Sequence, residues 1–212
     1  GNVIADVPGR DPAAPPVLVA CHLDSWDNGE GAHDDGAGIV QSIGMLSAFK
    51  KTGLQPRHSI RAVAFMNEEN GLAGGKAYAE EARVRNEKHL AAIESDAGGF
   101  VPRGFSIDTL NGLYEEVITW KSLFEPYMIE HFETEGGGAD LIALEDRRAH
   151  RRRAARCAVA PAGRLRRRPA HGAVAAHEHP AAVGVQLDAV AEAAVVVAEL
   201  ARAGGRPVGE VG

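Results

Sequence analysis

The sequence predicts an α/β fold, a three-layer α/β/α sandwich whose mostly parallel sheet carries helices on both faces. Short apolar runs typical of buried strands alternate with longer segments in which apolar residues recur at helical spacing. The 212 residues, 45% hydrophobic and 25% charged, suit a single domain with a sizeable core. No apolar run approaches the roughly 18 residues of a membrane span, so we expect no membrane partner.

The elements are predicted in the order strand, helix, strand, helix, strand. Residues 17–21 form the first apolar run, which indicates a buried strand. Apolar residues then recur at helical spacing over 39–49, and Gly53 follows as a stop signal. The next strand, helix and strand are predicted at 60–66, 71–85 and 90–93, and two further helices at 110–127 and 187–203.

Potential metal ligands follow each predicted strand. They are His22, Asp24, His33, Asp34 and Asp35 after the first strand, Glu68 and Glu69 after the second, and Glu94 and Asp96 after the third. The carboxyl ends of parallel strands meet at one edge of the sheet, where ligands of such folds bind. Imidazole together with carboxylates is a ligand set that suits Zn²⁺. The spacing alone leaves a metal site and an acidic surface equally open.

Four motifs decide between these two interpretations. Residues 22–27 (HLDSWD) and 31–38 (GAHDDGAG) resemble the signature of the co-catalytic two-zinc exopeptidases, which include leucyl aminopeptidases and glutamate carboxypeptidases. Residues 67–71 (NEENG) and 94–98 (ESDAG) stand where the next motifs of that family belong. HLDSWD and ESDAG are most similar to the carboxypeptidase Q branch. The resemblance covers the chain from residue 2 to about residue 144.

The resemblance implies that the chain binds two Zn²⁺ ions and a peptide substrate. Carried over residue by residue, it makes His22 and Asp96 ligands of one zinc and Glu69 a ligand of the other. Asp34 would bridge both ions, since two neighbouring cations need an anion between them. The family also implies a fifth ligand, a His shortly before the last helix.

The resemblance also implies two catalytic residues. Glu68 would be the general base that deprotonates the attacking water, and Asp24 would orient the ring of His22 through a hydrogen bond. The Asp34–Asp35 peptide bond would be cis. His33 and Glu94 receive no role, and His33 is interpreted as a loop residue.

Residues 147–177 depart from the family pattern. They hold ten Arg and no Asp or Glu, whereas the rest of the chain holds 13 Lys and Arg against all 29 Asp and Glu. The segment stands where the family has a strand and the fifth ligand, and His171, His177 and His179 lie nearby without a matching motif. We therefore expect one zinc to be weakly held or absent. We interpret the segment as out-of-frame translation of a GC-rich gene, with a basic nucleic-acid-binding arm as the alternative.

The predicted function is a metallopeptidase that hydrolyses dipeptides or short peptides, of aminopeptidase, carboxypeptidase or dipeptidase type. The alternatives are a catalytically impaired or non-catalytic relative that serves as a binding module, and an enzyme related to glutaminyl cyclases. We expect a single domain over 1–212 with a processed or truncated N-terminus, because Gly1 replaces an initiator Met. By analogy with the family we expect a secreted or periplasmic location and a homodimer, without a nucleic-acid partner.

Overall fold

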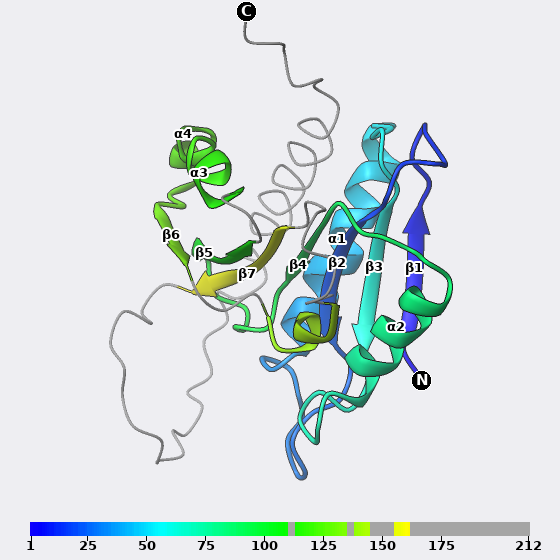
Figure 1. The fold of residues 1–212 in the computed structure, drawn as a ribbon. Coiled ribbons are helices and arrows are strands. Elements are labelled where there is room, and N and C mark those ends of the chain that lie inside the picture. The colour runs from blue at the N-terminus through cyan, green and yellow to red at the C-terminus, as the bar shows by residue number, and fades with distance from the viewer. Residues whose placement is uncertain (110–112, 135–137, 145–154, 162–212) are drawn as a thin grey trace, which may run out of the picture.

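The computed structural model describes residues 1–109, 113–134, 138–144 and 155–161 (Figure 1). The helix predicted at 187–203 and the three histidines His171, His177 and His179 lie outside these ranges. The elements are β1 (Val3–Val7), β2 (Val17–His22), α1 (Gly36–Thr52), β3 (Ile60–Phe65), α2 (Ala73–Val84), β4 (Ala91–Glu94), β5 (Pro102–Thr109), α3 (Leu113–Ile118), α4 (Lys121–Phe124), the 3₁₀ helix η1 (Glu125–Tyr127), β6 (His131–Thr134), the 3₁₀ helix η2 (Asp140–Leu144) and β7 (Ala155–Pro161).

The described strands form one mixed sheet in the order β1-β3-β2-β4-β7-β5-β6. Four pairings are parallel, namely β2 with β3, β2 with β4, β4 with β7, and β5 with β6. The pairings of β1 with β3 and of β5 with β7 are antiparallel. The predicted α/β class with a mostly parallel sheet is therefore confirmed.

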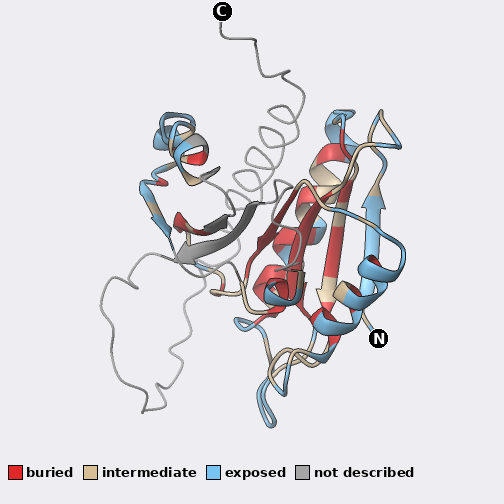
Figure 2. Ribbon diagram, in the orientation of Figure 1, coloured by how far each residue is buried: buried red, intermediate tan, exposed pale blue. Residues whose placement is uncertain are grey.

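The two faces of the sheet bury two separate cores, because successive residues of a strand point to opposite faces. Val17 and Val19 of β2 pack with Met45 and Phe49 of α1 on one face. On the other face, Leu18 and Ala20 pack with Tyr78 of α2 and Leu141 of η2. Figures 1 and 2 show the result, with the central strands buried and helices on both sides. No helix in the described ranges is long and apolar enough to cross a membrane.

The predicted central elements are confirmed to within two residues at each end, except that α1 extends three residues beyond its predicted range on either side. Gly53 ends α1 in the left-handed conformation, with φ 66°, as the stop signal requires. The predicted helix at 110–127 is wrong as one element, because α3, α4 and η1 replace it. The run Val117-Ile118-Thr119-Trp120 has low helix propensity, and Pro126 cannot continue an α-helix.

Strand β7 lies inside the Arg- and Ala-rich segment 147–177, to which the sequence assigned no element. It pairs in parallel with β4 and antiparallel with β5. Residues 155–161 thus form a strand in the part of the chain where the resemblance places one. Strands β1, β5 and β6 were also not predicted from the sequence.

A core substitution tests the two-layer packing. Leu18 is fully buried, whereas Leu54 just after α1 is 51% exposed. Leu18→Ala should lower the free energy of unfolding by about 2–5 kcal/mol, because it leaves a cavity between β2 and α2. Leu54→Ala, the matched control, should change it by less than about 0.5 kcal/mol. Urea denaturation of both variants is the measurement, and equal losses would contradict this placement of β2.

Candidate metal centre

The predicted site residues gather at the carboxyl edge of β2, β3 and β4. The loop after β2 leads to α1 on one face of the sheet, and the loop after β3 leads to α2 on the other. Such a divergence opens a crevice between neighbouring strands, which is where α/β folds bind ligands. His22 is the last residue of β2 and is buried.

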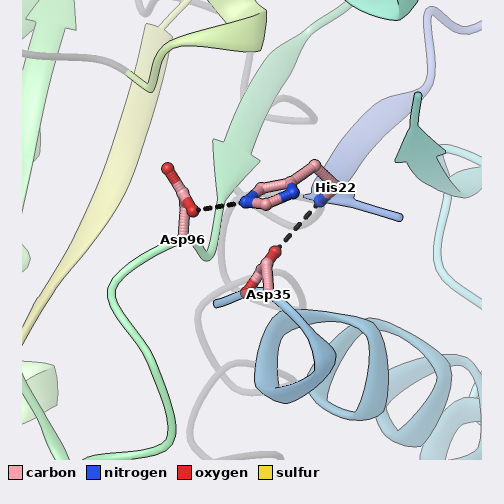
Figure 3. A group of neighbouring side chains, drawn as sticks. All are labelled: His22, Asp35 and Asp96. Carbon is pink, nitrogen blue, oxygen red and sulfur yellow. Dashed lines mark hydrogen bonds and ion pairs between the residues drawn. The ribbon is translucent and has the colours of Figure 1, made fainter. Parts of the chain in front are cut away.

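Two carboxylates converge on one nitrogen of His22. Nε2 lies 2.9 Å from Oδ1 of Asp34 and 3.0 Å from Oδ1 of Asp96 (Figure 3 shows the latter contact). The other nitrogen, Nδ1, donates to the main-chain oxygen of Asp24 at 3.0 Å. Because a carbonyl can only accept, Nδ1 carries a hydrogen and Nε2 is left to face the two carboxylates. Nε2 and the two carboxylates would each present a lone pair to the others, so a proton or a metal cation must lie between them.

The electrostatics of His22 lead to the same conclusion. Burial opposes the charged ring, but the hydrogen bond and the negative charge of Asp96, with further carboxylates nearby, raise the pKa of His22 to about 10. Without a metal the ring therefore holds a positive charge at neutral pH. A metal ion would take the place of the Nε2 proton, because ligating histidine is neutral.

The donor atoms fit zinc. His22, Asp34 and Glu69 bring ligand atoms within 4.8 Å of one another, and so do His22, Asp35 and Asp96. Oε1 of Glu69 is buried without a hydrogen-bond partner among the described residues, which is costly unless a cation meets it. Nitrogen and carboxylate oxygen are common ligands of Zn²⁺. The sequence predicted four of these five residues.

Asp35 is the one of these five residues to which the sequence analysis gave no role, and both of its carboxylate oxygens accept backbone N–H groups. Its Oδ2 accepts from the backbone N–H of His22 at 3.0 Å, and its Oδ1 accepts from the N–H of Gly38 at 2.9 Å (Figure 3 shows the bond to His22). Burial raises its pKa to about 7. An Asp directly before a helix is an N-cap signal that could have revealed this role. The Asp34–Asp35 peptide bond is cis, as predicted.

Asp24 acts through a different contact from the one that the resemblance implied. Its carboxylate lies 3.8 Å from Nδ1 of His22, beyond hydrogen-bond distance, and the ring is oriented by the main-chain oxygen instead. The carboxylate accepts from the backbone N–H groups of Glu68 at 3.0 Å and of Glu69 at 3.3 Å. Asp24 therefore joins the loop after β2 to the loop after β3 and fixes both glutamates.

Glu68 lies half-buried among the other carboxylates. Burial, followed by the negative charge of Asp96, raises the pKa of Glu68 above its usual value. A carboxylate with a raised pKa is a stronger base than an ordinary surface glutamate. This environment suits the predicted role in proton transfer.

Two further buried carboxylates, Glu94 and Asp140, lie behind the site. The N–H of Asp140 donates to Oε1 of Glu94 at 3.4 Å. The other oxygen of Glu94 and both carboxylate oxygens of Asp140 have no hydrogen-bond partner among the described residues. Burial raises the pKa of Glu94 to about 8 and that of Asp140 to about 7. Neither residue was assigned from the sequence, because no local pattern reveals that a carboxylate is buried.

A buried imidazole and clustered carboxylates at the carboxyl edge of an α/β sheet define a site of the metallohydrolase type. The model of peptidase family M28 matches residues 2–139, so the chain belongs to this family of metallopeptidases. The predicted resemblance is therefore confirmed.

Individual relatives agree with this assignment. Carboxypeptidase Q from Homo sapiens is 36% identical over 143 residues, which are 66% of this chain and 30% of that protein. Leupeptin-inactivating enzyme 1 from Streptomyces exfoliatus is 32% identical, over 65% of this chain and 31% of that enzyme. The chain thus spans about a third of the length of these relatives.

Solved structures show the same fold. A peptidase M28 precursor from Shewanella amazonensis has a TM-score of 0.72 at 29% identity, over 94% of this chain and 44% of that chain. A zinc aminopeptidase from Bacillus subtilis has a TM-score of 0.62 at 18% identity, over 96% of this chain and 50% of that chain.

Removal of the Asp24 carboxylate tests its role in holding the glutamate loop. Asp24→Ala should lower the free energy of unfolding by about 1–3 kcal/mol, because two half-buried N–H groups lose their acceptor. It should also weaken zinc binding, since Glu69 is no longer fixed. Asp27→Ala, at an exposed position of the same loop, is the matched control and should change neither quantity. Chelator competition and urea denaturation measure the two effects, and identical behaviour of the two variants would exclude this role.

Proposed function

We propose that this chain is the catalytic unit of a zinc-dependent exopeptidase that hydrolyses dipeptides or short peptides. The observation that carries the proposal is the convergence of Asp34 and Asp96 on Nε2 of His22. An oxygen of Glu69 lies close by and has no hydrogen-bond partner in the part of the chain that the structure describes. Family membership supports a peptide substrate. The names of the relatives, a carboxypeptidase and a zinc aminopeptidase, support attack at a chain end.

The positions of the four side chains support the ligand roles that we propose. His22 and Asp96 would hold one zinc, and Glu69 would hold the second. Asp34 would serve both, because its carboxylate reaches His22 and also belongs to the group that includes Glu69. A carboxylate has two oxygens and one negative charge, so it can link two cations and screen their repulsion.

The reaction requires a proton acceptor close to the attacking water. When bound, zinc would supply Lewis acidity, which lowers the pKa of water and polarises a peptide carbonyl. Glu68 would accept the proton that water loses as its oxygen bonds to the carbonyl carbon. Glu68 would then give that proton to the leaving nitrogen as the C–N bond breaks, which yields an amine and a carboxylic acid that loses its remaining proton to solvent. Asp24 would keep Glu68 in place through the backbone N–H bond.

A catalytically impaired relative is the second candidate. The segment 147–177 lacks a recognisable motif for the histidine that the family places before its last helix. Without an imidazole, the second zinc would be held by Asp34 and Glu69 alone, which makes a weaker and less selective site. In that case the chain would bind metal and peptide but turn over slowly.

Substitution of the base separates catalysis from metal binding. Glu68→Gln should reduce hydrolysis of a dipeptide panel by about a hundredfold to ten-thousandfold, because the amide cannot accept the proton of water. Zinc content should stay unchanged, since Glu68 is not among the proposed ligands. Glu30→Gln, at an exposed position of the loop after β2, is the control and should retain full activity. Unaltered turnover in Glu68→Gln would exclude this residue as the base.

Metal analysis after dialysis distinguishes the two candidates. We expect one tightly held zinc per chain and a second that is lost or exchanges readily. Within the described residues His22 is the one imidazole of both candidate groups, and it is proposed as a ligand of the first zinc alone. His22→Ala should abolish tight binding. Two tightly bound zinc ions would contradict the expectation and would show that another residue, such as His171, His177 or His179, completes the second position.

A further inference from the structure

His33 lies where two ligand-bearing loops meet, and the proposed reaction gives it no role. It precedes Asp34 in the loop before α1, yet its ring contacts residues that follow Asp96. The N–H of Gly99 donates to Nδ1 of His33 at 3.3 Å. The ring of Phe100 meets the imidazole edge-on, with centroids 5.0 Å apart and planes at 74°. Edge-to-face packing of this kind is favourable.

Gly98 makes the contact possible. Its φ of +87° is a conformation that side-chain-bearing residues rarely adopt. A β-carbon at Gly98 would lie 2.0 Å from both Cε1 and Nε2 of His33, which no real pair of atoms tolerates. The imidazole therefore fills the space that a side chain at Gly98 would need. The backbone after Asp96 is shaped to receive this ring.

The contact of His33 bears on the metal centre because two partly exposed carboxylates, those of Asp34 and Asp96, must reach one atom of His22. Asp34 is 53% exposed and Asp96 is 30% exposed, yet both lie within 3.0 Å of Nε2 of His22. Asp35 anchors the first loop by capping α1. The ring of His33 reaches from this anchored loop to the second loop, two to four residues beyond Asp96.

We propose that His33 is a positioning residue that locks the loop of Asp96 to the loop of Asp34 and so sets the separation of these two carboxylates. The proposal rests on the proposed function, in which both carboxylates hold zinc. The contacts described for His33 are with Gly98, Gly99 and Phe100 and involve none of the proposed ligand atoms. His33 therefore affects how tightly the site binds zinc and how the ligands are arranged around the ion.

The test compares His33→Ala, His33→Asn and the control His131→Ala, which removes an exposed histidine of β6. Zinc affinity is measured by chelator competition, and the visible spectrum of the Co²⁺-loaded protein reports the ligand geometry. His33→Ala should bind zinc about tenfold to a hundredfold more weakly, with an altered Co²⁺ spectrum. His33→Asn should recover part of the affinity, because its side-chain oxygen can accept from Gly99. His131→Ala should match the unaltered protein.

A double-mutant cycle tests the steric part of the contact. Gly98→Ala should weaken zinc binding more in the presence of His33 than in the His33→Ala background, where the clash with the ring is absent and the strain of the positive φ remains. Additive effects would overturn the proposal, and so would an unchanged affinity and spectrum in His33→Ala. If the unaltered chain binds no zinc, the proposed function itself fails. Normal zinc binding that is insensitive to His33 overturns the positioning role alone.

Discussion

The rest of the site depends on the two hydrogen bonds that the carboxylate of Asp35 accepts from the main chain. This carboxylate is buried and accepts one N–H from the last residue of β2 and one from the first turn of α1. Because Asp34 precedes it directly, this clamp also fixes Asp34 beside His22. The first turn of α1 also lies against the residue that follows β4, since a β-carbon at Gly38 would lie 2.2 Å from the main-chain oxygen of Ser95. Two strand ends and a helix start are therefore held at one point, and ligands from separate parts of the chain meet there.

The second constraint is electrostatic. Burial and neighbouring carboxylates raise the pKa values of Glu68, Glu69, Glu94 and Asp140. Each shift records a free-energy cost of keeping that group ionised in this place. A single imidazolium at His22 cannot neutralise so many acids. A fold that gathers negative charge around a buried imidazole lowers this cost by taking up cations, which is why a metal centre accounts for these residues better than an acidic surface.

The sequence predicted the centre of the fold well and its edges poorly, for a physical reason. Strands β2 and β4 are buried along their whole length, so they appear as continuous apolar runs. Strand β1 is an edge strand that is largely exposed, as Figure 2 shows, although four of its five residues are apolar, so its residue pattern does not reveal its place in the sheet. The same limit applies within the site. The ligand types after each strand are visible in the sequence, whereas the bonds of Asp24 to the glutamate loop span more than 40 residues and need the fold to be seen.

The Arg- and Ala-rich segment 147–177 shows that pairing in a sheet tolerates more sequence change than the supply of a metal ligand does. Strand β7 connects β4 to β5 within the described sheet, although its residues belong to the segment that departs from the family pattern. Ladder hydrogen bonds use backbone groups that every residue except proline supplies, so many sequences can complete a sheet. A metal ligand requires one side-chain type at one position. A change that scrambles 147–177 can therefore preserve the sheet and still remove a ligand. This difference reconciles a continuous sheet with the weak second zinc position that we expect.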